Sequence, residues 1–542
     1  MLALFKRTTV LLFLICLGSF LLTIYRAGDV SVCTNADESA FGYNAFSILK
    51  TGRDEYGTFL PLRLKSFGDN KLPLYSYFSI PFVAALGLND VGIRGLNMLI
   101  SILLPIAVYF LTIELLGKKS YGLVAAFFTA LSLSTHITAR QAHESILSLL
   151  LSITMFIFYL RSLRSYKPKD IILFLLATVL SLLSYHPARL LALFLATSHA
   201  IMFFVVPKIE KKRLFVLGGF FIAALALLLS VDIFYNPSRL NNLLFVNSPG
   251  FSLRINELRG EGANRFLYNK LTLGAKELIY QNLAYYSPQF LLSRGDENYR
   301  FGYPGMSLIT ALEFLFLFIG LYYLFKNKNK HRFFIVALLL VAPLSGSLSW
   351  AGISLTRVLF LFVLIFVIAG YGAVEFIKEI PKKNRAVAIV ALIILQIIGL
   401  FSSWDFYLNH YPKRAVVIRS QECGYTELAQ YVSDNYSSYK KFYITKQNGE
   451  PYMHLLYRLK YPPSKYQPQS HLTAADQYGF GQVESFDKFV FSLPNELNEK
   501  NVVYIGFPDE LKNRPGFNAG SDSKGLKTIS VGTEEIFSIL ER

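Results

Sequence analysis

The sequence predicts a mainly α protein: a polytopic bundle of about 11 transmembrane helices with a small extracytoplasmic α/β domain at its C-terminal end. Two observations support this fold class. First, 53% of the 542 residues are hydrophobic and only 17% are charged, whereas soluble domains carry roughly 25% charged residues. Second, the hydrophobic residues fall into membrane-length runs, and basic residues cluster between alternate runs. The same composition excludes a disordered chain, and three cysteines exclude a disulfide-stapled scaffold.

Eleven apolar segments are candidates for membrane spans, which need ~20 mainly apolar residues each. They lie near residues 9–25, 94–116, 121–138, 144–161, 171–186, 189–207, 213–234, 304–325, 332–349, 353–377 and 386–404. A basic pair before the first run resembles the start of a signal peptide. No small-residue cleavage pattern follows Tyr25, so we expect this span to be retained as an anchor.

Six clusters of lysine and arginine mark the N-terminus and every second connection between the spans. They are Lys6/Arg7, Lys118/Lys119, Arg161/Arg164/Lys167/Lys169, Lys208/Lys211/Lys212/Arg213, Lys326/Lys328/Lys330/Arg332 and Lys378/Lys382/Lys383/Arg385. Short basic loops stay in the cytoplasm, which predicts a multi-pass protein of the cell membrane with a cytoplasmic N-terminus and an external C-terminus. The net charge of +18 is then mostly an orientation signal, and we expect no nucleic-acid partner.

This topology predicts two domains: a transmembrane domain over residues 1–404 and an extracytoplasmic domain over residues 405–542. Two long external loops interrupt the first domain, at about 26–93 and 235–303. In the tail, β-rich runs at 442–445 and 502–506 alternate with helical stretches at 427–432 and 452–459. This alternation predicts a small α/β fold.

The first external loop carries an acid pair, Asp37 and Glu38, followed by residues that can form an amphipathic helix at the membrane surface. A carboxylate at the start of such a helix meets the helix dipole and an apolar boundary, which suits a general base. An aspartate before an apolar run is also a common helix cap. The acid pair alone leaves both explanations open.

Lys71, later in the same loop, precedes Pro73 and two tyrosines, Tyr75 and Tyr77. A lysine held in a proline-containing turn beside the membrane suits binding of a phosphate headgroup. Lysine and tyrosine are equally typical of interfacial anchors. The residue types alone therefore do not decide between these two functions.

The order of the spans, the Asp37-Glu38 pair and the Lys-x-Pro-Leu-x-x-Tyr run from Lys71 resemble membrane glycosyltransferases of the GT-C class. The most similar members are protein O-mannosyltransferases and bacterial aminoarabinose transferases, of the glycosyltransferase family 39 type. The resemblance covers about residues 35–190 and extends more loosely to about 360. It implies a GT-C fold, with Asp37 as the catalytic base beside Glu38, and with Lys71 in contact with the lipid phosphate. Leu72 stands where the family has the first proline of its Lys-Pro-Pro-Leu motif, so this chain keeps only the second proline, Pro73, in the turn.

Further candidate residues lie at the predicted outer ends of the spans. Arg140 and Glu144 are expected one helical turn apart, where they either face the active site or pair with each other. Arg357 is expected one turn into a span, and an arginine there is costly unless it faces a partner or a cavity. The predicted donor-phosphate residues are Lys71, Arg357, Arg140 and Arg189, supported by Glu144, Tyr75 and His186. For the run at 285–300 we expect only a role in shaping the second large loop.

The sequence points to no certain cofactor. Its eight histidines show no paired ligand spacing for a metal, and no glycine-rich nucleotide loop occurs. Some GT-C relatives use a divalent ion, so the resemblance leaves a metal ion open. Cys33 and Cys423 are both predicted to be external and can bridge loop one to the tail, although pairing cannot be read from sequence.

The expected function is an inverting, mannosyltransferase-like transfer of a monosaccharide from a polyprenyl-phosphate donor to an acceptor hydroxyl on the outer face of the membrane. The acceptor is a protein, a lipid or a cell-envelope glycan. One alternative is a transporter or flippase of lipid-linked glycans, which would want ionisable residues deep in the spans and repeated halves. Another is a membrane-anchored binding protein, which would leave the loop-one acids and Arg357 unexplained.

Overall fold

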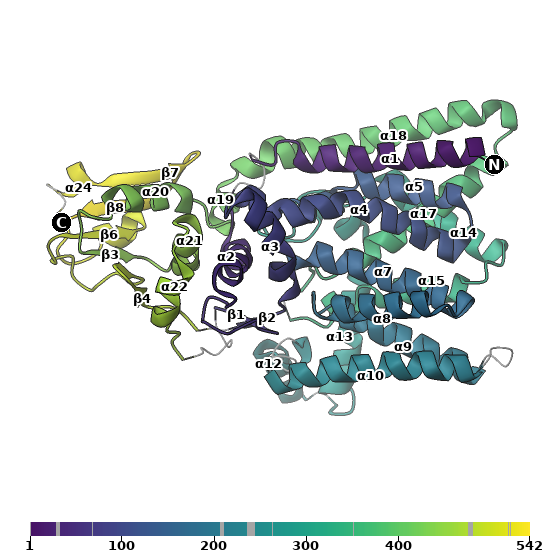
Figure 1. Cartoon of the computed structure of the whole chain (residues 1–542), viewed down its shortest axis with the longest axis horizontal. Coiled ribbons are helices and arrows are strands. Elements are labelled where there is room, and N and C mark those ends of the chain that lie inside the picture. Colours follow the sequence, from purple (N-terminus) through teal and green to yellow (C-terminus); the bar gives the residue numbers. More distant parts are fainter. Residues whose placement is uncertain are drawn as a thin grey trace. The chain divides into compact units, whose positions relative to one another are not determined.

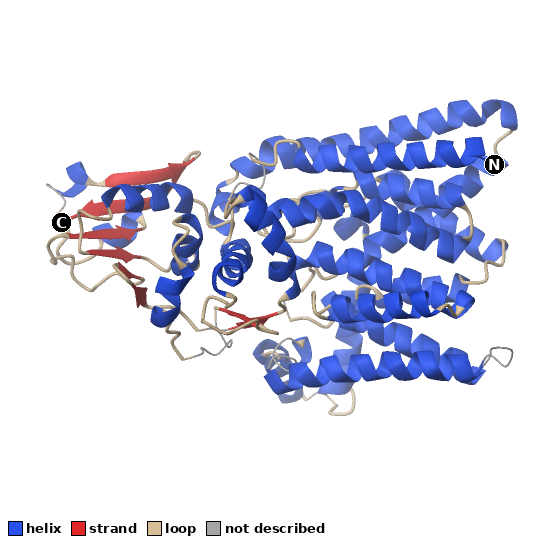
Figure 2. Ribbon diagram, viewed as in Figure 1, coloured by secondary structure: helices blue, strands red, loops and turns tan. Residues whose placement is uncertain are grey.

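The computed structural model describes residues 2–28, 33–67, 69–205, 211–235, 244–262, 264–350, 352–474, 481–518, 520 and 522–542. These residues are mainly helical, and their named strands form one sheet in the tail and one short hairpin (Figures 1 and 2). The chain divides into two compact units. The helical unit comprises Met1–Tyr25, Asn97–Arg140 and Glu144–Phe406, and the α/β unit comprises Arg26–Leu96, Gln141–His143 and Tyr407–Arg542. The α/β unit thus groups the predicted first external loop with the tail.

Each of the eleven predicted spans coincides with a helix or a pair of helices. These are α1 (Leu2–Ile24), α4 (Asp90–Leu116), α5 and α6 (Lys119–Leu131, Leu133–Ala139), α7 (Glu144–Ser165), α8 (Pro168–Leu182), α9 (Ala188–Val205), α10 (Lys211–Tyr235), α14 (Ala311–Lys326), α15 and α16 (Arg332–Val341, Leu344–Ser347), α17 (Leu359–Glu379) and α18 (Arg385–Asp405). Among the described residues, six helices are long and apolar enough to cross a membrane, or seven if the bent pair α5–α6 is one span. Eleven crossings therefore remain a prediction.

Helix α17 forms the core of the helical unit. Every residue from Leu359 to Ala373 is buried, and the helix packs against α5, α7, α14 and α15. Glycines permit the closest approaches: a Cβ on Gly372 would lie 2.4 Å from the carbonyl oxygen of Phe316 in α14. A helix that is apolar on all sides is typical of the interior of a membrane bundle.

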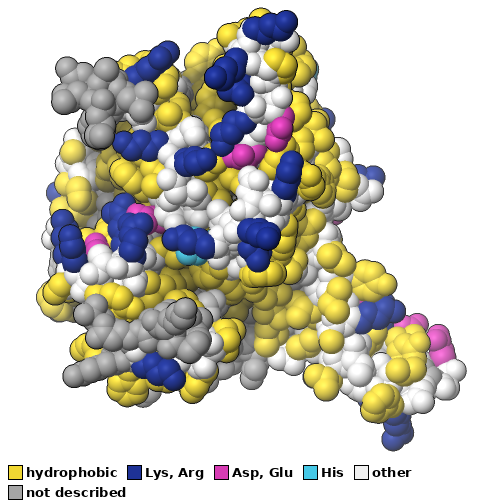
Figure 3. Space-filling view, turned by 90° about the vertical axis from the view of Figure 1, so that its right-hand side faces the viewer, with side chains coloured by type: hydrophobic (Ala, Val, Ile, Leu, Met, Phe, Trp, Pro, Cys, Tyr) yellow, Lys and Arg dark blue, Asp and Glu magenta, His cyan; other side chains and the backbone are white. Residues whose placement is uncertain are grey.

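The basic connections lie together at one end of the helical unit. The junctions α4–α5, α7–α8, α14–α15 and α17–α18 share this end with the N-terminus (Figure 1), and Figure 3 shows lysine and arginine side chains gathered there. This is the arrangement that the predicted topology requires, although the side of the membrane remains a prediction. Lys208 and the side chains of Lys6, Lys212 and Arg213 lie outside the described residues.

The tail contains the predicted small α/β fold. Its six-stranded sheet has the order β4-β5-β3-β6-β8-β7, with β3 parallel to β5 and β6. The strands are β3 (Lys441–Ile444), β4 (Ser485–Phe486), β5 (Phe489–Val490), β6 (Val502–Gly506), β7 (Lys527–Val531) and β8 (Glu534–Glu541), and the two longest tail helices are α20 (Tyr425–Asn435) and α21 (Pro451–Arg458). All five residues of β6 are buried, as expected for a central strand covered on both faces.

The first loop folds into α2 (Ala36–Thr51), the hairpin β1–β2 (Leu64–Ser66, Asp69–Lys71) and α3 (Leu74–Leu86). The predicted helix is present as α2, which begins at Ala36 and contains the acid pair, but the expected amphipathic exposure of this helix at a surface is wrong. Helix α2 is buried on most sides and packs against α3 and α21. Gly42 also permits a close approach to the start of α4, because a Cβ there would lie 2.5 Å from the Ile93 side chain.

Candidate active site

Asp37 and Lys71 meet in the α/β unit, where the Lys71 Nζ lies 2.5 Å from the Asp37 Oδ1. Asp37 is in the first turn of α2, and Lys71 is the last residue of β2. The Asp37 side chain is 31% exposed and the Lys71 side chain 12%, so the carboxylate is accessible from solvent. The structure thus brings together the two residues that the sequence predicts as base and phosphate contact.

Asp37 is not the cap of α2. The N-cap residue is Asn35, whose side-chain oxygen accepts a hydrogen bond from the Glu38 amide at 3.1 Å. The capping explanation for Asp37 is therefore wrong. The Asp37 carboxylate still lies at the helix N-terminus, where the helix dipole stabilises a negative charge.

Aromatic rings surround the Lys71 ammonium. Its Nζ lies 5.0 Å from the centre of the Phe41 ring and 4.6 Å from that of Phe67, within the range of cation–π attraction. Leu72, the departure from the family motif, is buried, and Pro73 is the N-cap of α3. The proline-containing turn after Lys71 is therefore present. Tyr75, predicted to support the site, is fully buried and donates to the Ile93 carbonyl at 3.2 Å.

Glu38 has a different setting from its neighbour Asp37. Its side chain is fully buried and accepts two hydrogen bonds from the Arg94 guanidinium, at 2.9 and 3.0 Å. The Ala142 amide donates to the same carboxylate at 2.6 Å. This geometry favours a structural role for Glu38, since a buried carboxylate held by two partners is poorly placed to meet a substrate.

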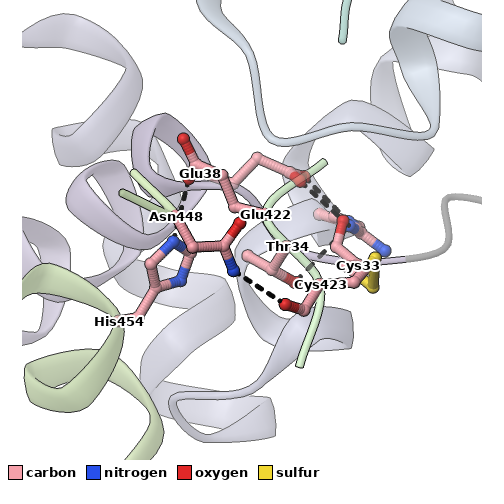
Figure 4. Close-up of a disulfide and its surroundings, with 8 residues drawn as sticks. Cys33, Thr34, Glu38, Glu422, Cys423, Asn448 and His454 are labelled. Atoms are coloured by element: carbon pink, nitrogen blue, oxygen red, sulfur yellow. Dashed lines mark hydrogen bonds and ion pairs between the residues drawn. A yellow bond between two sulfur atoms is a disulfide. The ribbon is translucent and has the colours of Figure 1, made fainter. Parts of the chain in front are cut away.

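The tail is bonded to the segment before α2. Cys33 and Cys423 form a disulfide with their Cα atoms 5.4 Å apart, across 390 residues of sequence (Figure 4). The pairing that the sequence leaves open is therefore present. Cys16, the remaining cysteine, is buried as a free thiol in α1.

A second carboxyl group near Lys71, that of Glu55, is fully buried. Glu55 accepts hydrogen bonds from Asn44 at 3.1 Å and from the Tyr452 hydroxyl at 3.3 Å. Burial raises the pKa of Glu55 to about 8, and the neighbouring Asp54 charge adds to the rise while Lys71 opposes it. No sequence pattern pointed to Glu55, because its burial depends on the tail.

This pKa predicts a pH dependence of stability that Glu55→Gln removes. Between the ordinary pKa of 4.5 and the folded value of about 8, the folded protein keeps a proton that the unfolded chain has released. Stability should therefore fall as the pH rises through this range, by at most about 1.4 kcal/mol per pH unit from this group. Thermal unfolding in detergent at pH 5 to 8 checks this. Glu496→Gln, on the tail surface, should keep the wild-type pH profile, and an unchanged profile in Glu55→Gln would refute the assignment.

In the helical unit, Arg357 lines a small pocket, here called the bundle pocket. Its polar lining consists of Ser145, Ser148, Ser152, Tyr185, Ser345, Thr356 and Arg357. The Arg357 guanidinium donates hydrogen bonds to the Ser349 hydroxyl and to the Tyr185 side chain. The Glu144 carboxylate interacts electrostatically with the same Tyr185 side chain. Arg357 precedes α17 instead of lying one turn inside it. It nevertheless faces a polar pocket, as the cost of a charge in a bundle requires.

The expected shared face of Arg140 and Glu144 is wrong, because α6 ends at Ala139 and α7 begins at Glu144. Arg140 is fully buried and donates to the carbonyls of Leu22 at 3.3 Å and Tyr25 at 2.7 Å. These carbonyls lie at the C-terminal end of α1, where a cation is stabilising. This geometry favours a structural role for Arg140, and its predicted contact with the donor phosphate stays a prediction.

The other predicted residues of the helical unit lie at the start of α9. His186 is in the turn before this helix and Arg189 is in its first turn, and both are half-buried. Neither His186 nor Arg189 is among the described residues that line the bundle pocket. They share the helical unit with Arg357, and their predicted contact with the donor stays a prediction.

The sequence does not predict the structural role of Asp296, which binds the segment that carries Arg357. Its side chain is 2% exposed and accepts hydrogen bonds from the amides of Leu355 at 2.7 Å and Asn298 at 2.9 Å. It therefore ties the second large loop to the segment that carries Arg357. The acidic residues of the run at 285–300 were the only sequence feature that could have indicated this role. The partner, the Leu355 amide, is 59 residues farther along the chain and could not be inferred from them.

No group of three or more His, Cys, Asp or Glu side chains that could hold a metal ion occurs in the part of the chain that the structure describes. The possibility of a divalent ion therefore has no ligand set among these residues.

Comparisons with known proteins identify the fold. No protein-family model matches this sequence, and neither does the sequence of any curated protein. The apo structure of ArnT from Cupriavidus metallidurans aligns with a TM-score of 0.53 at 11% identity, over 98% of this chain and 97% of that one. The oligosaccharyltransferase of Archaeoglobus fulgidus, tethered with an acceptor peptide containing the NVT sequon, gives a TM-score of 0.53 at 12% identity, over 83% of this chain.

A third structure, the same archaeal enzyme in complex with Zn and sulfate, gives a TM-score of 0.50 at 11% identity, over 82% of this chain and 61% of that one. This chain spans 63% of the archaeal enzyme in the tethered structure, less than two thirds of its length. At these identities the similarity shows the fold. The predicted GT-C fold, a mainly helical membrane architecture with a small C-terminal sheet region, is confirmed.

Proposed function

We propose that this protein is an inverting membrane glycosyltransferase that moves a monosaccharide from a polyprenyl-phosphate donor to an acceptor hydroxyl. The observation that carries the proposal is the Asp37–Lys71 pair, 2.5 Å apart at the start of α2 in a GT-C fold. One member of the pair can accept a proton, and the other can stabilise a phosphate. These are the two functions that such a transfer needs.

Transfer proceeds by a single displacement. Asp37 accepts the proton of the acceptor hydroxyl while the hydroxyl oxygen attacks the anomeric carbon on the face opposite the phosphate. The bond between the anomeric carbon and the phosphate oxygen breaks, and polyprenyl phosphate leaves with the electron pair. General base catalysis of this kind contributes ~10²–10⁴ in rate. The displacement inverts the anomeric carbon.

Lys71 interacts with two negatively charged groups, the Asp37 carboxylate and the phosphate of the donor. Its ammonium has three N–H donors, so it can keep its contact with Asp37 and bind a phosphate oxygen of the donor. A preorganised charge beside the leaving group contributes ~10²–10³ in rate. Arg357, Arg140 and Arg189 stay predicted donor-phosphate residues, of which Arg357 has the most suitable surroundings because hydroxyl groups line its pocket.

A lipid-linked glycan flippase is the second candidate, and the bent helix pair α5–α6 favours it. The axis turns by 57° at this break, and discontinuous helices are typical of transport sites. However, side chains of α6 already bond to the backbone carbonyls at this break. The Thr135 hydroxyl donates to the Thr129 carbonyl at 3.0 Å, and His136 Nε2 lies 2.7 Å from the Ala130 carbonyl oxygen. The α5–α6 break therefore offers a cargo few backbone groups.

Reconstitution into vesicles distinguishes the two functions. Vesicles that contain the protein and a polyprenyl-phosphate sugar should form glycosylated acceptor and release polyprenyl phosphate. Passage of lipid-linked glycan across the vesicle membrane without any transfer would contradict the proposal and support the flippase. Vesicles with Asp37→Asn protein are the matched control.

The disulfide predicts the side of the membrane on which α2 lies. Disulfides persist in oxidising compartments, so we expect Cys33 to be extracytoplasmic. In Cys423→Ser protein, the half-buried Cys33 thiol should react with a membrane-impermeant maleimide in intact cells. The Cys33→Ser/Cys423→Ser protein, which keeps only the buried Cys16, is the control and should stay unlabelled. Labelling of Cys33 only after the cells are opened would reverse the predicted topology.

A further inference from the structure

Two buried residues of the tail contact the first turn of α2. The Glu422 carboxylate accepts a hydrogen bond from the Ala36 amide at 2.7 Å. The same oxygen lies 2.9 Å from Nε2 of His454, whose Nδ1 is 3.4 Å from the Ser39 hydroxyl. Glu422 and His454 are 5% and 0% exposed, and Figure 4 shows both beside the disulfide. The tail thus holds the turn that contains Asp37.

The tail in turn fixes the orientation of His454. The Tyr425 ring stacks on the imidazole, with ring centres 4.0 Å apart and planes within 8°. The Tyr425 hydroxyl donates to the Asn448 backbone carbonyl at 2.8 Å. The Asn448 side-chain amide donates to the Cys423 carbonyl at 3.1 Å (Figure 4). These contacts keep the imidazole in one orientation toward α2.

The backbone leaves room for the Glu422 side chain. Gly449 has a φ of +84°, and a Cβ at this position would lie 2.4 Å from the Glu422 carboxyl carbon. The disulfide at Cys423, the next residue, bonds the same segment to Cys33, close to the start of α2. A covalent bond and a hydrogen-bonded pair therefore act on the same turn.

Stability alone is a poor explanation for this polar pair. Burying polar and charged groups is costly, and apolar residues of similar volume often replace a buried pair without loss of stability. What an apolar pair cannot supply is a hydrogen-bond acceptor for the Ala36 amide, which belongs to the residue just before Asp37. The Glu422–His454 pair is therefore better explained as a means of fixing the geometry of the first turn of α2.

We propose that Glu422 and His454 are positioning residues that fix the first turn of α2 and thereby hold the Asp37 carboxylate against Lys71. This rests on the proposed transferase function. Glu422 binds the backbone of α2 at Ala36, the residue before Asp37, and His454 binds Glu422, so the pair acts on the backbone of this turn. A displacement of about 1 Å in a reacting group can cost ~10²-fold in rate. The tail is accordingly part of the catalytic apparatus, although it supplies none of the proposed reacting groups.

The experiment compares Glu422→Ala with Glu422→Gln in the full chain. The alanine variant should lose ~10²-fold in kcat with little change in the KM for the donor, because the proton acceptor moves while Lys71 remains. Glutamine keeps a neutral acceptor for the Ala36 amide and should restore most of the rate. Hydrogen–deuterium exchange should increase at the amides of Ala36–Ser39 in the alanine variant and stay unchanged in β6 and β8.

Asp522→Ala is the matched control, because Asp522 is also 5% exposed and binds Arg542 within the tail. It should leave kcat and exchange in α2 unchanged. If Glu422→Ala does not fold, His454→Gln replaces it in the same comparison. Wild-type kcat and wild-type exchange at Ala36–Ser39 in the folded variant would overturn the proposal. The exchange measurement does not need activity, so a protein without transferase activity would refute the proposed function alone.

Discussion

Asp37→Asn is expected to lose sugar transfer by ~10²–10⁴-fold, the range for removal of a general base. Asparagine has the shape of aspartate but cannot accept the proton of the acceptor hydroxyl. The cap of α2 is Asn35, so the substitution should leave the helix and the fold intact. Initial rates of transfer from a polyprenyl-phosphate sugar, together with thermal unfolding in detergent, measure both effects.

Asp54→Asn is the control for the loss of a carboxylate in the same loop. Asp54 accepts backbone hydrogen bonds from Tyr56 at 3.0 Å and Thr58 at 2.8 Å, and asparagine can accept both. We expect this variant to keep wild-type transfer. Full activity in Asp37→Asn protein would remove Asp37 from the mechanism.

Lys71→Gln is expected to lower kcat by ~10²–10³-fold, the typical cost of one preorganised charge beside a leaving group. The KM for the donor should rise as well, because the ammonium also binds the phosphate before transfer. Lys71→Arg should recover only part of the rate, since a planar guanidinium does not replace a compact ammonium held between two rings. Steady-state kinetics with varied donor concentration separate these effects.

Lys65→Gln serves as the matched control for charge in the same hairpin. Lys65 is in β1, is exposed, and pairs in register with Asn70, next to Lys71. Its loss should leave kcat and KM unchanged. Equal losses in Lys65→Gln and Lys71→Gln would show that the hairpin needs only general positive charge, which would contradict the specific role of Lys71.

The helices of the bundle were predictable because hydropathy is a local property. Each apolar run of suitable length became a helix, since a buried backbone must satisfy its hydrogen bonds internally. The tail strands at 441–444 and 502–506 were predictable for the same reason, from short β-branched and aromatic runs. The Asp37–Lys71 pair came from a motif resemblance combined with topology, and the structure places the two side chains in contact.

The partners of the site residues were not predictable, because they lie far apart in sequence. Glu38 pairs with Arg94, 56 residues on, and Ala36 with Glu422, 386 residues on. Helix periodicity carries no information about such contacts. Helix periodicity also gave a wrong prediction for Arg140 and Glu144. It treated them as residues of one helix and placed them on a common face, whereas the chain breaks between the end of α6 and the start of α7.

The most direct test of the account is mass spectrometry of the lipids that co-purify with Asp37→Asn protein. This variant should bind the donor and fail to consume it, so a polyprenyl-phosphate monosaccharide should be enriched over wild-type protein. The Asp37→Asn/Lys71→Gln protein should lose this enrichment, because the phosphate contact is gone. A lipid-linked oligosaccharide diphosphate in place of the monosaccharide phosphate, or no polyprenyl lipid at all, would contradict the account.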